Sequence, residues 1–578
     1  MTDIQQFNKT EHVSFSCSYK EPVRWYMWLF VFIAIIFTGL VIWGTVYDYL
    51  RHRNTSSDNN SGTTTNVAMK EMSQANAGNE EPVTETSKVN PDASNEAGST
   101  EGAANANPKP TDDPLPNQKP EAIQERPQMS KGARILMGFS VTTNTSEVMS
   151  CKRPPSNLGA INGIRVLSMT WIIWLHTTYY IETTGFIDNP AYLSQDIQRK
   201  FWYKLVSEGD LGVDSFFVLS GLLVTYLTLK KMKATGGEIS WPLFYFQRYM
   251  RLTPLLVFAI GVYIGLSALV GRGYQKNETY SEYAHHCLVY GAANVLYINN
   301  LFPSPYLITV CMGWTWYLAN DMQFYVISPL FLLLLCRPSR AKFGIALTIA
   351  VTVISVVMTM GFSWGFKITG GNYPGGHPDA FAPGGGILYA TPWCRIQSYT
   401  VGIFVGYLLY KVNGQKKKIP SVWNAVGWST AMFAVLLPVF AMYFTSYERL
   451  LPVWIGGIWI GIKRLMFSSG VGWITYACIT GNGGFVDTFL SLKIWLPLAK
   501  LSYAAYLFHP IVMEHWIYTS KTEFHWTAHN AIYMFFSFFA VTYIVSFVSS
   551  LLVEIPFTKM TKILTERPVV KVQRRDVL

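Results

Sequence analysis

Long apolar runs separated by short basic loops restrict the fold of this 578-residue chain more than any other feature. A helix of about 20 apolar residues crosses a bilayer, and inside lipid a chain satisfies its backbone hydrogen bonds only as helices or as a closed barrel. Only 14% of the residues are charged, compared with about 25% in soluble domains. The chain therefore reads as a membrane protein with some soluble sequence attached.

Eleven runs are long enough to span a membrane. The first, 25–44, follows a polar lead and reads as a retained anchor helix rather than a cleaved signal peptide. Ten more lie at 163–181, 211–229, 252–270, 314–335, 343–361, 394–411, 425–444, 453–479, 494–517 and 529–552. The eighth of these is interrupted by Lys463 and Arg464. We predict an all-α polytopic membrane protein, with a ten-helix core preceded by one anchor helix.

The segments outside the core have compositions of their own. Residues 1–24 form a short extracytoplasmic N-terminus. Residues 54–133 are rich in Ser, Thr, Asn, Glu and Pro and cannot bury enough apolar surface to fold, so we expect a disordered cytoplasmic linker. The core domain is expected over 158–556, followed by a basic cytoplasmic tail at 557–578.

Lysine and arginine are distributed unevenly over the connections between the runs. The alternate set that begins with 152–165 contains 23 of them and the other set contains 8. Because short cytoplasmic loops carry the excess of positive charge, we expect the first set of connections and the C-terminus to lie in the cytoplasm. The membrane is expected to be the plasma membrane or the endoplasmic reticulum. The basic loops also account for the net charge of +11. The sequence contains no known nucleic-acid-binding motif, so we do not expect the protein to bind nucleic acid.

Cys287 and Cys311 fall in one outward loop, where an oxidising compartment permits a disulfide. The alternative is two free thiols. The sequon that begins at Asn277 lies in the same loop and is a candidate glycosylation site, unless it is unused. The remaining cysteines have no metal-like spacing, so we expect no metal site.

Arg165 and His176 are ionisable residues inside the apolar run 163–181. Eleven helical residues return to within about 20° of the same face and rise roughly 16 Å, so both side chains lie on one stripe. Ionisable groups at such depth usually face a protein interior and indicate a functional site. Histidine is the side chain best suited to accept a hydroxyl proton near neutral pH. The alternative is an interfacial arginine and a histidine satisfied by a helix neighbour.

Arg248 and Arg251 precede the run 252–270 at its cytoplasmic mouth. Arginines at positions i and i+3 point the same way, and their planar guanidinium groups suit phosphate oxygens. A donor with a nucleotide group, such as a coenzyme A thioester, would need such a phosphate-binding pair of arginines. The alternative is that the two arginines only orient the helix in the membrane, as the positive-inside rule describes.

Two carboxylates and one small pair stand near these candidates. Asp214 is expected to face the bundle or the outer interface, and Ser220-Gly221 favours close helix packing over a nucleophile. Asp321 can orient the imidazole or an acceptor hydroxyl, cap its helix, or pair with Arg395.

His509 precedes Pro510 in the run 494–517, where it can simply support a kink. Tyr506 lies one turn before it.

Five motifs occur in order, and together they resemble the acyltransferase-3 membrane family. They are Arg-x10-His at 165–176, Val-Asp-Ser-Phe-Phe-Val-Leu-Ser-Gly at 213–221, Arg-x-x-Arg at 248–251, Trp-x-Leu-x-x-Asp at 316–321 followed by Gln-Phe-Tyr, and Tyr-Leu-Phe-His at 506–509. The sequence from Cys311 to Tyr325 is similar to that of the animal branch named nose resistant to fluoxetine proteins.

The resemblance implies a ten-helix O-acyltransferase that takes an acyl group from cytoplasmic acyl-CoA, with no bound cofactor, and transfers it to a hydroxyl acceptor. Carried over by position, His176 would be the catalytic base with Arg165 in the same site, and Arg248 and Arg251 would contact the donor. Asp321 stands where many relatives have glutamate. The other supporting residues of the matched motifs are Asp214, Tyr506 and His509.

One departure concerns the N-terminus, because a cysteine-rich extracellular domain often precedes the anchor helix in the animal branch. Here only 24 residues precede it, so we expect a shortened member or an incomplete sequence. The acceptor is expected to be a lipid or small molecule in contact with the membrane lipids. The competing hypothesis is a lipid or drug transport or uptake protein built on the same helical bundle, which has no requirement for a thioester.

Overall fold

The computed structural model describes residues 28, 31–53, 129–152, 158–197, 199–269, 277–304, 310–368, 384–444 and 451–566. The predicted N-terminal lead 1–24, the predicted linker up to residue 128 and the tail beyond residue 566 lie outside the described residues. The chain divides into one unit made of residues 1–45 and 135–578 and a second made of residues 46–134. The first unit contains the ten-helix core.

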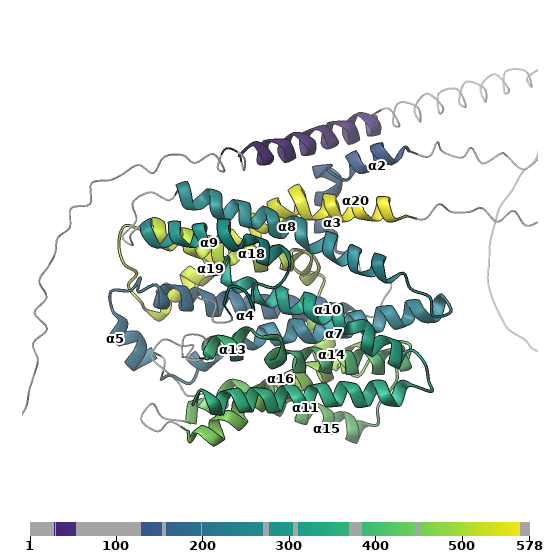
Figure 1. Ribbon diagram of the computed structural model, residues 1–578, viewed down its shortest axis with the longest axis vertical. Helices are drawn as coiled ribbons and strands as arrows, with labels where there is room; N and C mark the ends of the chain where they lie inside the picture. Colours follow the sequence, from purple (N-terminus) through teal and green to yellow (C-terminus); the bar gives the residue numbers. More distant parts are fainter. Residues whose placement is uncertain are drawn as a thin grey trace, which may run out of the picture. The chain divides into compact units, whose positions relative to one another are not determined.

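Ten helices of at least 20 residues make up most of the described part of this unit, and each coincides with one predicted run (Figure 1). They are α4 (Gly159–Thr183), α7 (Leu211–Ala234), α8 (Trp241–Leu269), α10 (Trp316–Leu335), α11 (Ala341–Gly365), α14 (Pro392–Lys411), α15 (Ser421–Phe440), α16 (Val453–Ile479), α18 (Trp495–Thr519) and α19 (Ala528–Ser549). Residues 31–44 of the predicted anchor lie in the helix Val31–Arg53, which continues nine residues past the predicted end. The described residues form no named strand, so the all-α prediction is confirmed.

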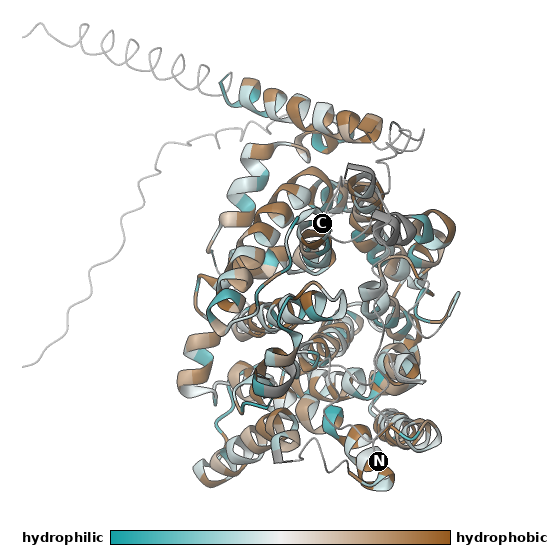
Figure 2. Ribbon diagram, turned by 90° about the vertical axis from the view of Figure 1, so that its left-hand side faces the viewer, coloured by the Kyte–Doolittle hydropathy of each residue, from teal (hydrophilic) through white to brown (hydrophobic). Residues whose placement is uncertain are grey.

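Seven of the described helices, including the anchor, are both long and apolar enough to cross a membrane. The helices α4, α14, α16 and α18 are as long but less apolar on average, and they are not among these seven. Their ionisable side chains lie largely inside the bundle, as Arg395, Arg464 and His509 show by being almost completely buried. The aliphatic side chains of α11 and α19 are instead widely exposed, and Figure 2 shows hydrophobic residues on many helices of the bundle. The polar interior is formed by the four less apolar helices together with α7 and α10, which contain the buried Asp214 and Asp321.

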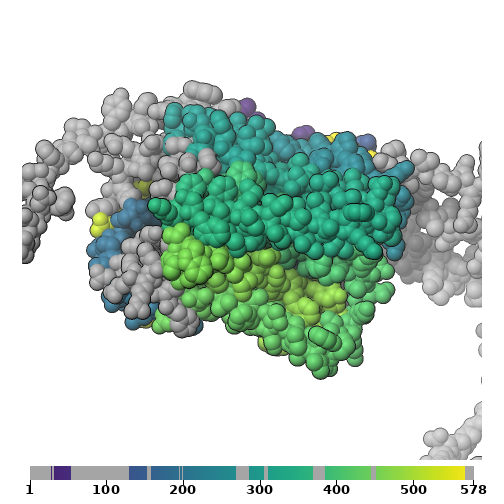
Figure 3. All heavy atoms as spheres, turned by 60° about the horizontal axis from the view of Figure 1, so that its bottom comes forward, coloured from purple at the N-terminus to yellow at the C-terminus, as the bar shows by residue number. Residues whose placement is uncertain are grey.

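The helices α4, α7 and α10 lie between two groups of helices in Figure 1, with α11, α15 and α16 on one side and α8, α18 and α19 on the other. Segments from α11 to α16 cover much of the face seen in Figure 3. The closest packing joins α7 to α14. A Cβ added at Gly221 would lie 2.3 Å from the carbonyl oxygen of Tyr399, and one at Gly402 would lie 2.2 Å from that of Val218. Small residues thus bring these two backbones together, as predicted for Ser220-Gly221.

Shorter elements connect the long helices or flank them. They are α2 (Lys131–Met137), α3 (Val141–Met149), α5 (Pro190–Tyr192), η1 (Leu193–Ile197), α6 (Tyr203–Ser207), α9 (Asn277–Val295), η2 (Gly313–Thr315), α13 (Gly385–Ala390), η3 (Ala441–Phe444), α17 (Gly484–Leu490), η4 (Ser550–Glu554) and α20 (Ile555–Thr565). The helix α2 begins within the predicted disordered linker, and α20 includes the start of the segment predicted as a basic tail.

The connection between α8 and α10 contains the predicted disulfide. Cys287 in α9 is bonded to Cys311, with 2.07 Å between the two sulfur atoms, so this prediction is confirmed. The candidate glycosylation residue Asn277 is the first residue of α9.

Candidate active site

His176 and His509 face each other inside the bundle. His176 lies on α4 and His509 on α18, and the Nδ1 atom of His176 lies 2.7 Å from the Nε2 atom of His509. The two rings are nearly parallel, with 5.0 Å between their centroids. His509 is fully buried. The prediction that His509 only supports a kink is therefore incomplete, because it is also the hydrogen-bond partner of the candidate base.

The contacts of His509 determine how the protons are distributed over the pair. Its Nδ1 atom lies 3.0 Å from the carbonyl oxygen of Ala505, and a carbonyl oxygen only accepts hydrogen bonds, so His509 Nδ1 carries the hydrogen. In the neutral ring His509 Nε2 is then an acceptor. His176 Nδ1 consequently donates to it, and the lone pair of neutral His176 resides on its Nε2 atom. This assignment follows from the hydrogen-bond network, and it gives His176 the tautomer that a general base needs.

A second cluster forms around Asp321 of α10. Its Oδ2 atom accepts a hydrogen bond from Arg248 of α8 in an ion pair, and its Oδ1 atom accepts one from Ser220 of α7 at 2.5 Å. The side chain of Asp321 is 6% exposed and that of Arg248 is 18% exposed. The guanidinium group of Arg248 also lies 4.5 Å from the ring centre of Tyr325, which adds a cation–π contact. The partner of Asp321 is thus Arg248, and not Arg395 or a helix terminus as two of the alternatives proposed.

The helix α8 begins at Trp241, eleven residues before the predicted start of its run. Arg248 and Arg251 therefore lie on the helix and not in a loop before it. The segment 241–251 is aromatic and amphipathic, so a search for uninterrupted apolar residues does not include it. Arg251 is exposed and Arg165 on α4 is half-buried, and the charges of Arg248 and Arg251 both act on Arg165. Three arginines thus share one region of the bundle, and the charge of one of them is balanced by Asp321.

Tyrosine side chains connect this arginine cluster to the histidine pair. The ring of Tyr317 lies 5.3 Å from that of Tyr506, and the ring of Tyr506 lies 6.3 Å from that of His509. The hydroxyl of Tyr506 donates to the carbonyl oxygen of Trp314 at 2.5 Å, and the indole nitrogen of Trp314 donates to the carbonyl oxygen of Leu507 at 3.3 Å. The segment before α10 is therefore fixed against α18 one turn from His509.

Asp214 is fully buried and faces the bundle, which confirms one of the two predicted positions. Its Oδ1 atom accepts from Ser398 at 2.7 Å, and its Oδ2 atom accepts from Arg395 at 3.2 Å and lies 4.0 Å from Arg464 Nε. Arg395 also lies over the ring of Tyr389 at 4.9 Å. Burial raises the pKa of Tyr389, in the short helix α13, to about 12. This group joins α7, α14 and α16 and stands apart from the contacts of Arg248.

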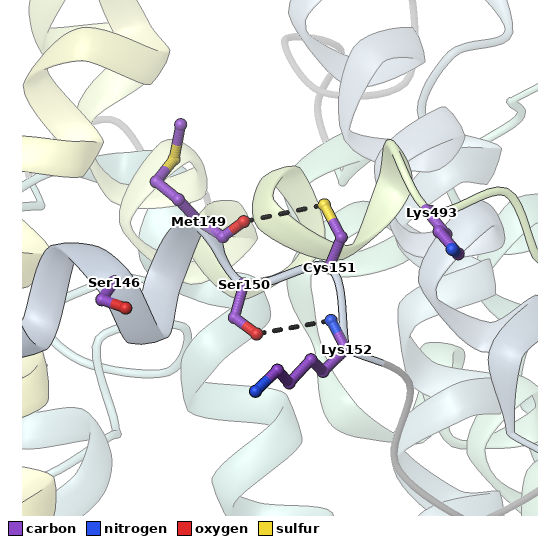
Figure 4. A pocket seen from close by; sticks show the side chains of 6 residues that line it. All are labelled: Ser146, Met149, Ser150, Cys151, Lys152 and Lys493. Carbon is purple, nitrogen blue, oxygen red and sulfur yellow. Dashed lines mark hydrogen bonds between the residues drawn. The ribbon is translucent and has the colours of Figure 1, made fainter. Parts of the chain in front are cut away.

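A shallow hollow lies where α3 ends and before α18 begins, as Figure 4 shows. Lys152 and Lys493 reach it from separate segments. Nearby, the Nζ atom of Lys500 donates to three carbonyl oxygens at the end of α3, those of Glu147, Val148 and Ser150, at 2.7–3.2 Å. The lysines thus place positive charge at the end of the bundle where α4 begins.

Two further polar residues belong to the interior although no motif included them. Glu514 of α18 is 6% exposed and accepts a hydrogen bond from Tyr263 at 2.7 Å. Tyr180 packs edge-on against the ring of His176, with 5.6 Å between the centroids. Glu514 is an acidic residue inside an apolar run, and this signal was available in the sequence. Tyr180 lies four residues after His176, and only the position of the base identifies it.

Fold and site together define an integral multi-pass membrane protein with a histidine pair inside its helical bundle and an arginine cluster that extends from the interior to the exposed Arg251. A family model described as an acyltransferase domain matches residues 158–553, which is more than half of the chain. The chain therefore belongs to the acyltransferase-3 membrane family.

Three curated relatives indicate where the chain stands in this family. It is 29% identical over 463 residues to Nose resistant to fluoxetine protein 6 of Caenorhabditis elegans, covering 75% of this chain and 54% of the relative. It is 26% identical to Regulator of hypoxia-inducible factor 1 of the same organism, covering 47% and 57%. It is 27% identical to Putative peptidoglycan O-acetyltransferase YrhL of Bacillus subtilis, covering 53% and 44%. The chain thus spans about half the length of these relatives, and no solved structure matches it.

Proposed function

We propose that this protein is an integral-membrane O-acyltransferase that moves an acyl group from cytoplasmic acyl-CoA to a hydroxyl acceptor. The observation that carries the proposal is the hydrogen bond between His176 and His509 at 2.7 Å. It holds the imidazole of His176 in one tautomer inside the bundle, as a carboxylate does in hydrolase triads. Membership of the acyltransferase-3 family supports the same reaction class.

The reaction follows from this geometry in two steps. The acceptor hydroxyl oxygen attacks the thioester carbonyl carbon while His176 Nε2 takes the hydroxyl proton. The tetrahedral intermediate then collapses, the carbon–sulfur bond breaks, and the imidazolium of His176 gives its proton to the departing thiolate. The products are an acyl ester and coenzyme A, and the histidine returns to its starting state. His509 is a positioning residue, because it acts only through His176.

The arginine cluster supports binding of the donor. Asp321 balances the charge of Arg248, so Arg165 and Arg251 supply the positive charge for the phosphates, while Arg248 orders the region between them. The lysines around the hollow in Figure 4 add positive charge at the same end of the bundle. Phosphate oxygens are well matched by arginine. The acceptor in this proposal is a lipid or small molecule that reaches His176 within the membrane.

The direct test measures acyl transfer from radiolabelled acyl-CoA to the lipid extract of membranes that contain the protein. His176→Ala is expected to reduce transfer by at least 10²-fold, in the range for loss of a general base, while the amount of inserted protein stays unchanged. His529→Ala, an exposed histidine of α19, is the matched control. Transfer that persists in His176→Ala at the rate of the control would refute the assignment of the base.

Coenzyme A binding separates an enzyme from a transporter on the same bundle. Arg251→Ala is expected to weaken binding of coenzyme A to the solubilised protein about tenfold, because a charge-assisted hydrogen bond contributes about 1.5 kcal/mol or more. Arg337→Ala removes an exposed arginine that lies between α10 and α11 and controls for net charge. Equal affinity of both variants for coenzyme A would show that Arg251 does not contribute to the donor site.

A further inference from the structure

A second pocket of about 340 Å³ lies beside α4, on the side away from His176. It is bounded by α4, by the segment around α6 and by the start of α19, and its walls include Trp174, Thr178, Trp202, Trp526 and Ala531. Two residues along a helix turn the side chain by roughly 200°, so Trp174 and Thr178 point away from the histidine between them. The volume falls at the lower end of the range for small-molecule sites. The pocket is therefore separate from the candidate active site but shares a helix with it.

One wall contains a buried hydrogen-bond donor that has no acceptor. Trp526 is 1% exposed, and its Nε1 atom has no hydrogen-bond partner. The backbone of Trp526 is fixed on both sides by Asn189, whose Oδ1 atom accepts from Trp526 N at 2.8 Å and whose Nδ2 atom donates to Trp526 O at 2.9 Å. A buried N–H group without a partner costs free energy. Because the Nε1 atom is itself buried, an oxygen acceptor in the pocket removes that cost only when the indole ring turns toward the pocket as the acceptor binds.

The rim of the pocket shows where an occupant would come from. Trp202 is 44% exposed, Ile532 is 47% exposed and the neighbouring Tyr533 is 72% exposed. Such large apolar and aromatic side chains on a multi-pass membrane protein face lipid, and tryptophan and tyrosine gather where the bilayer meets water. The loops that flank the pocket belong to the set with few basic residues, which the charge distribution assigns to the outside.

We propose that this pocket binds a membrane lipid of the outer leaflet. The hydrocarbon body of the lipid lies between the tryptophan side chains, and one lipid oxygen accepts the hydrogen bond of Trp526 Nε1. A sterol hydroxyl and the ester carbonyl of a phospholipid share this chemistry. Because Trp174 and Thr178 flank His176 on α4, the bound lipid also supports the helix that holds the candidate base.

The test uses the full-length protein in vesicles that contain either a diazirine-bearing cholesterol or a diazirine-bearing phosphatidylcholine. After irradiation, the labelled peptides are identified by mass spectrometry. We expect label on the α4 peptide with Trp174 and on the α19 peptide with Ile532, from one of the two probes, and that probe identifies the source of the oxygen. Absence of label from both peptides with both probes would overturn the proposal.

Two substitutions test the pocket itself. Ala531→Trp fills it and is expected to reduce labelling at least fivefold; if that variant does not fold, Ala531→Leu fills part of it. Trp526→Phe keeps an aromatic ring and removes the N–H donor. The affinity of the pocket for unlabelled lipid, measured by competition, is therefore expected to fall three- to tenfold, which corresponds to the loss of about one hydrogen bond.

Trp473→Phe is the matched control, because Trp473 on α16 also has an Nε1 atom without a partner but does not line the pocket. Labelling of a folded Ala531→Trp variant at the wild-type level would show that the lipid binds elsewhere. Equal competition in Trp526→Phe and Trp473→Phe would overturn the role of the indole N–H. None of these readouts depends on acyl transfer.

Discussion

The ion pair between Arg248 and Asp321 gives the sharpest quantitative prediction, because it depends only on the structure. Asp321→Asn removes the carboxylate charge and leaves Arg248, which is 18% exposed, inside the bundle without its counter-charge. Breaking a buried pair from one side costs about 3–5 kcal/mol. We expect about 3 kcal/mol, the lower end, because the stacking of Arg248 on Tyr325 remains.

The reverse substitution, Arg248→Gln, leaves the carboxylate of Asp321 with its hydrogen bond from Ser220 only. We expect a loss of about 3 kcal/mol for this variant as well. Arg248→Gln combined with Asp321→Asn leaves two neutral side chains and no unpaired charge, so the expected loss is at most about 3 kcal/mol, not the sum of about 6 kcal/mol. The coupling between the two positions is therefore at least about 3 kcal/mol.

The free energy of unfolding is measured for wild type and the three variants in lipid–detergent micelles, by titration with dodecyl sulfate. The ion pair between Lys559 and Glu147 is the control, because Glu147 is 59% exposed and surface pairs couple by less than about 1 kcal/mol. Additive effects within about 0.5 kcal/mol at Arg248 and Asp321 would refute the statement that this pair is buried and mutually dependent.

Three more predictions concern the positioning of the base, the helix packing and the outward loop. His509→Leu is expected to lower acyl transfer by on the order of 10²-fold, and His509→Gln, whose amide oxygen can accept from His176 Nδ1, is expected to recover part of it. Unchanged rates and pH profiles in both would contradict the assigned tautomer. Gly402→Ala places a Cβ 2.2 Å from Val218 O and is expected to cost about 2 kcal/mol of unfolding free energy. Gly361→Ala is the control, because nothing lies within 4 Å of the added Cβ, and it is expected to leave the free energy of unfolding unchanged or to raise it by up to about 1 kcal/mol. A smaller loss for Gly402→Ala than for Gly361→Ala would contradict the close packing of α7 against α14. Cys287→Ser opens a loop of 24 residues and is expected to cost about 3 kcal/mol. In membranes denatured with dodecyl sulfate, maleimide is expected to label Cys287 and Cys311 only after reduction, and labelling without reduction would argue against the disulfide.

The sequence was sufficient to locate all ten long helices of the core, because each has an apolar run that ends at polar or basic residues. It was less informative about helix ends. The segment 241–251 alternates aromatic and polar residues, so the helical start of α8 at Trp241 does not stand out as apolar. Short helices such as α17 are formed by tertiary contact, as where Gly163 packs against Leu490, and such contacts have no local signal.

The candidate residues were identifiable one by one, but their partners were not. Both His176 and His509 stood out as ionisable residues in apolar runs, yet their contact depends on how α4 and α18 are rotated about their axes. The same limit applies to Asp321, which pairs with Arg248 although Arg395 was the partner considered from the sequence. Residue spacing fixes which side chains share a face of one helix, and it does not fix which helix that face meets.

The disulfide loop has a consequence for how the interior of the bundle can be influenced from one of its ends. Trp314 follows Cys311 by three positions, and its indole and carbonyl groups are hydrogen-bonded to Leu507 and Tyr506 on α18. His509 lies two residues beyond Leu507. A molecule that binds the loop containing Cys311, such as an antibody fragment, therefore acts on α18, the helix that places His509 against His176, without entering the bundle.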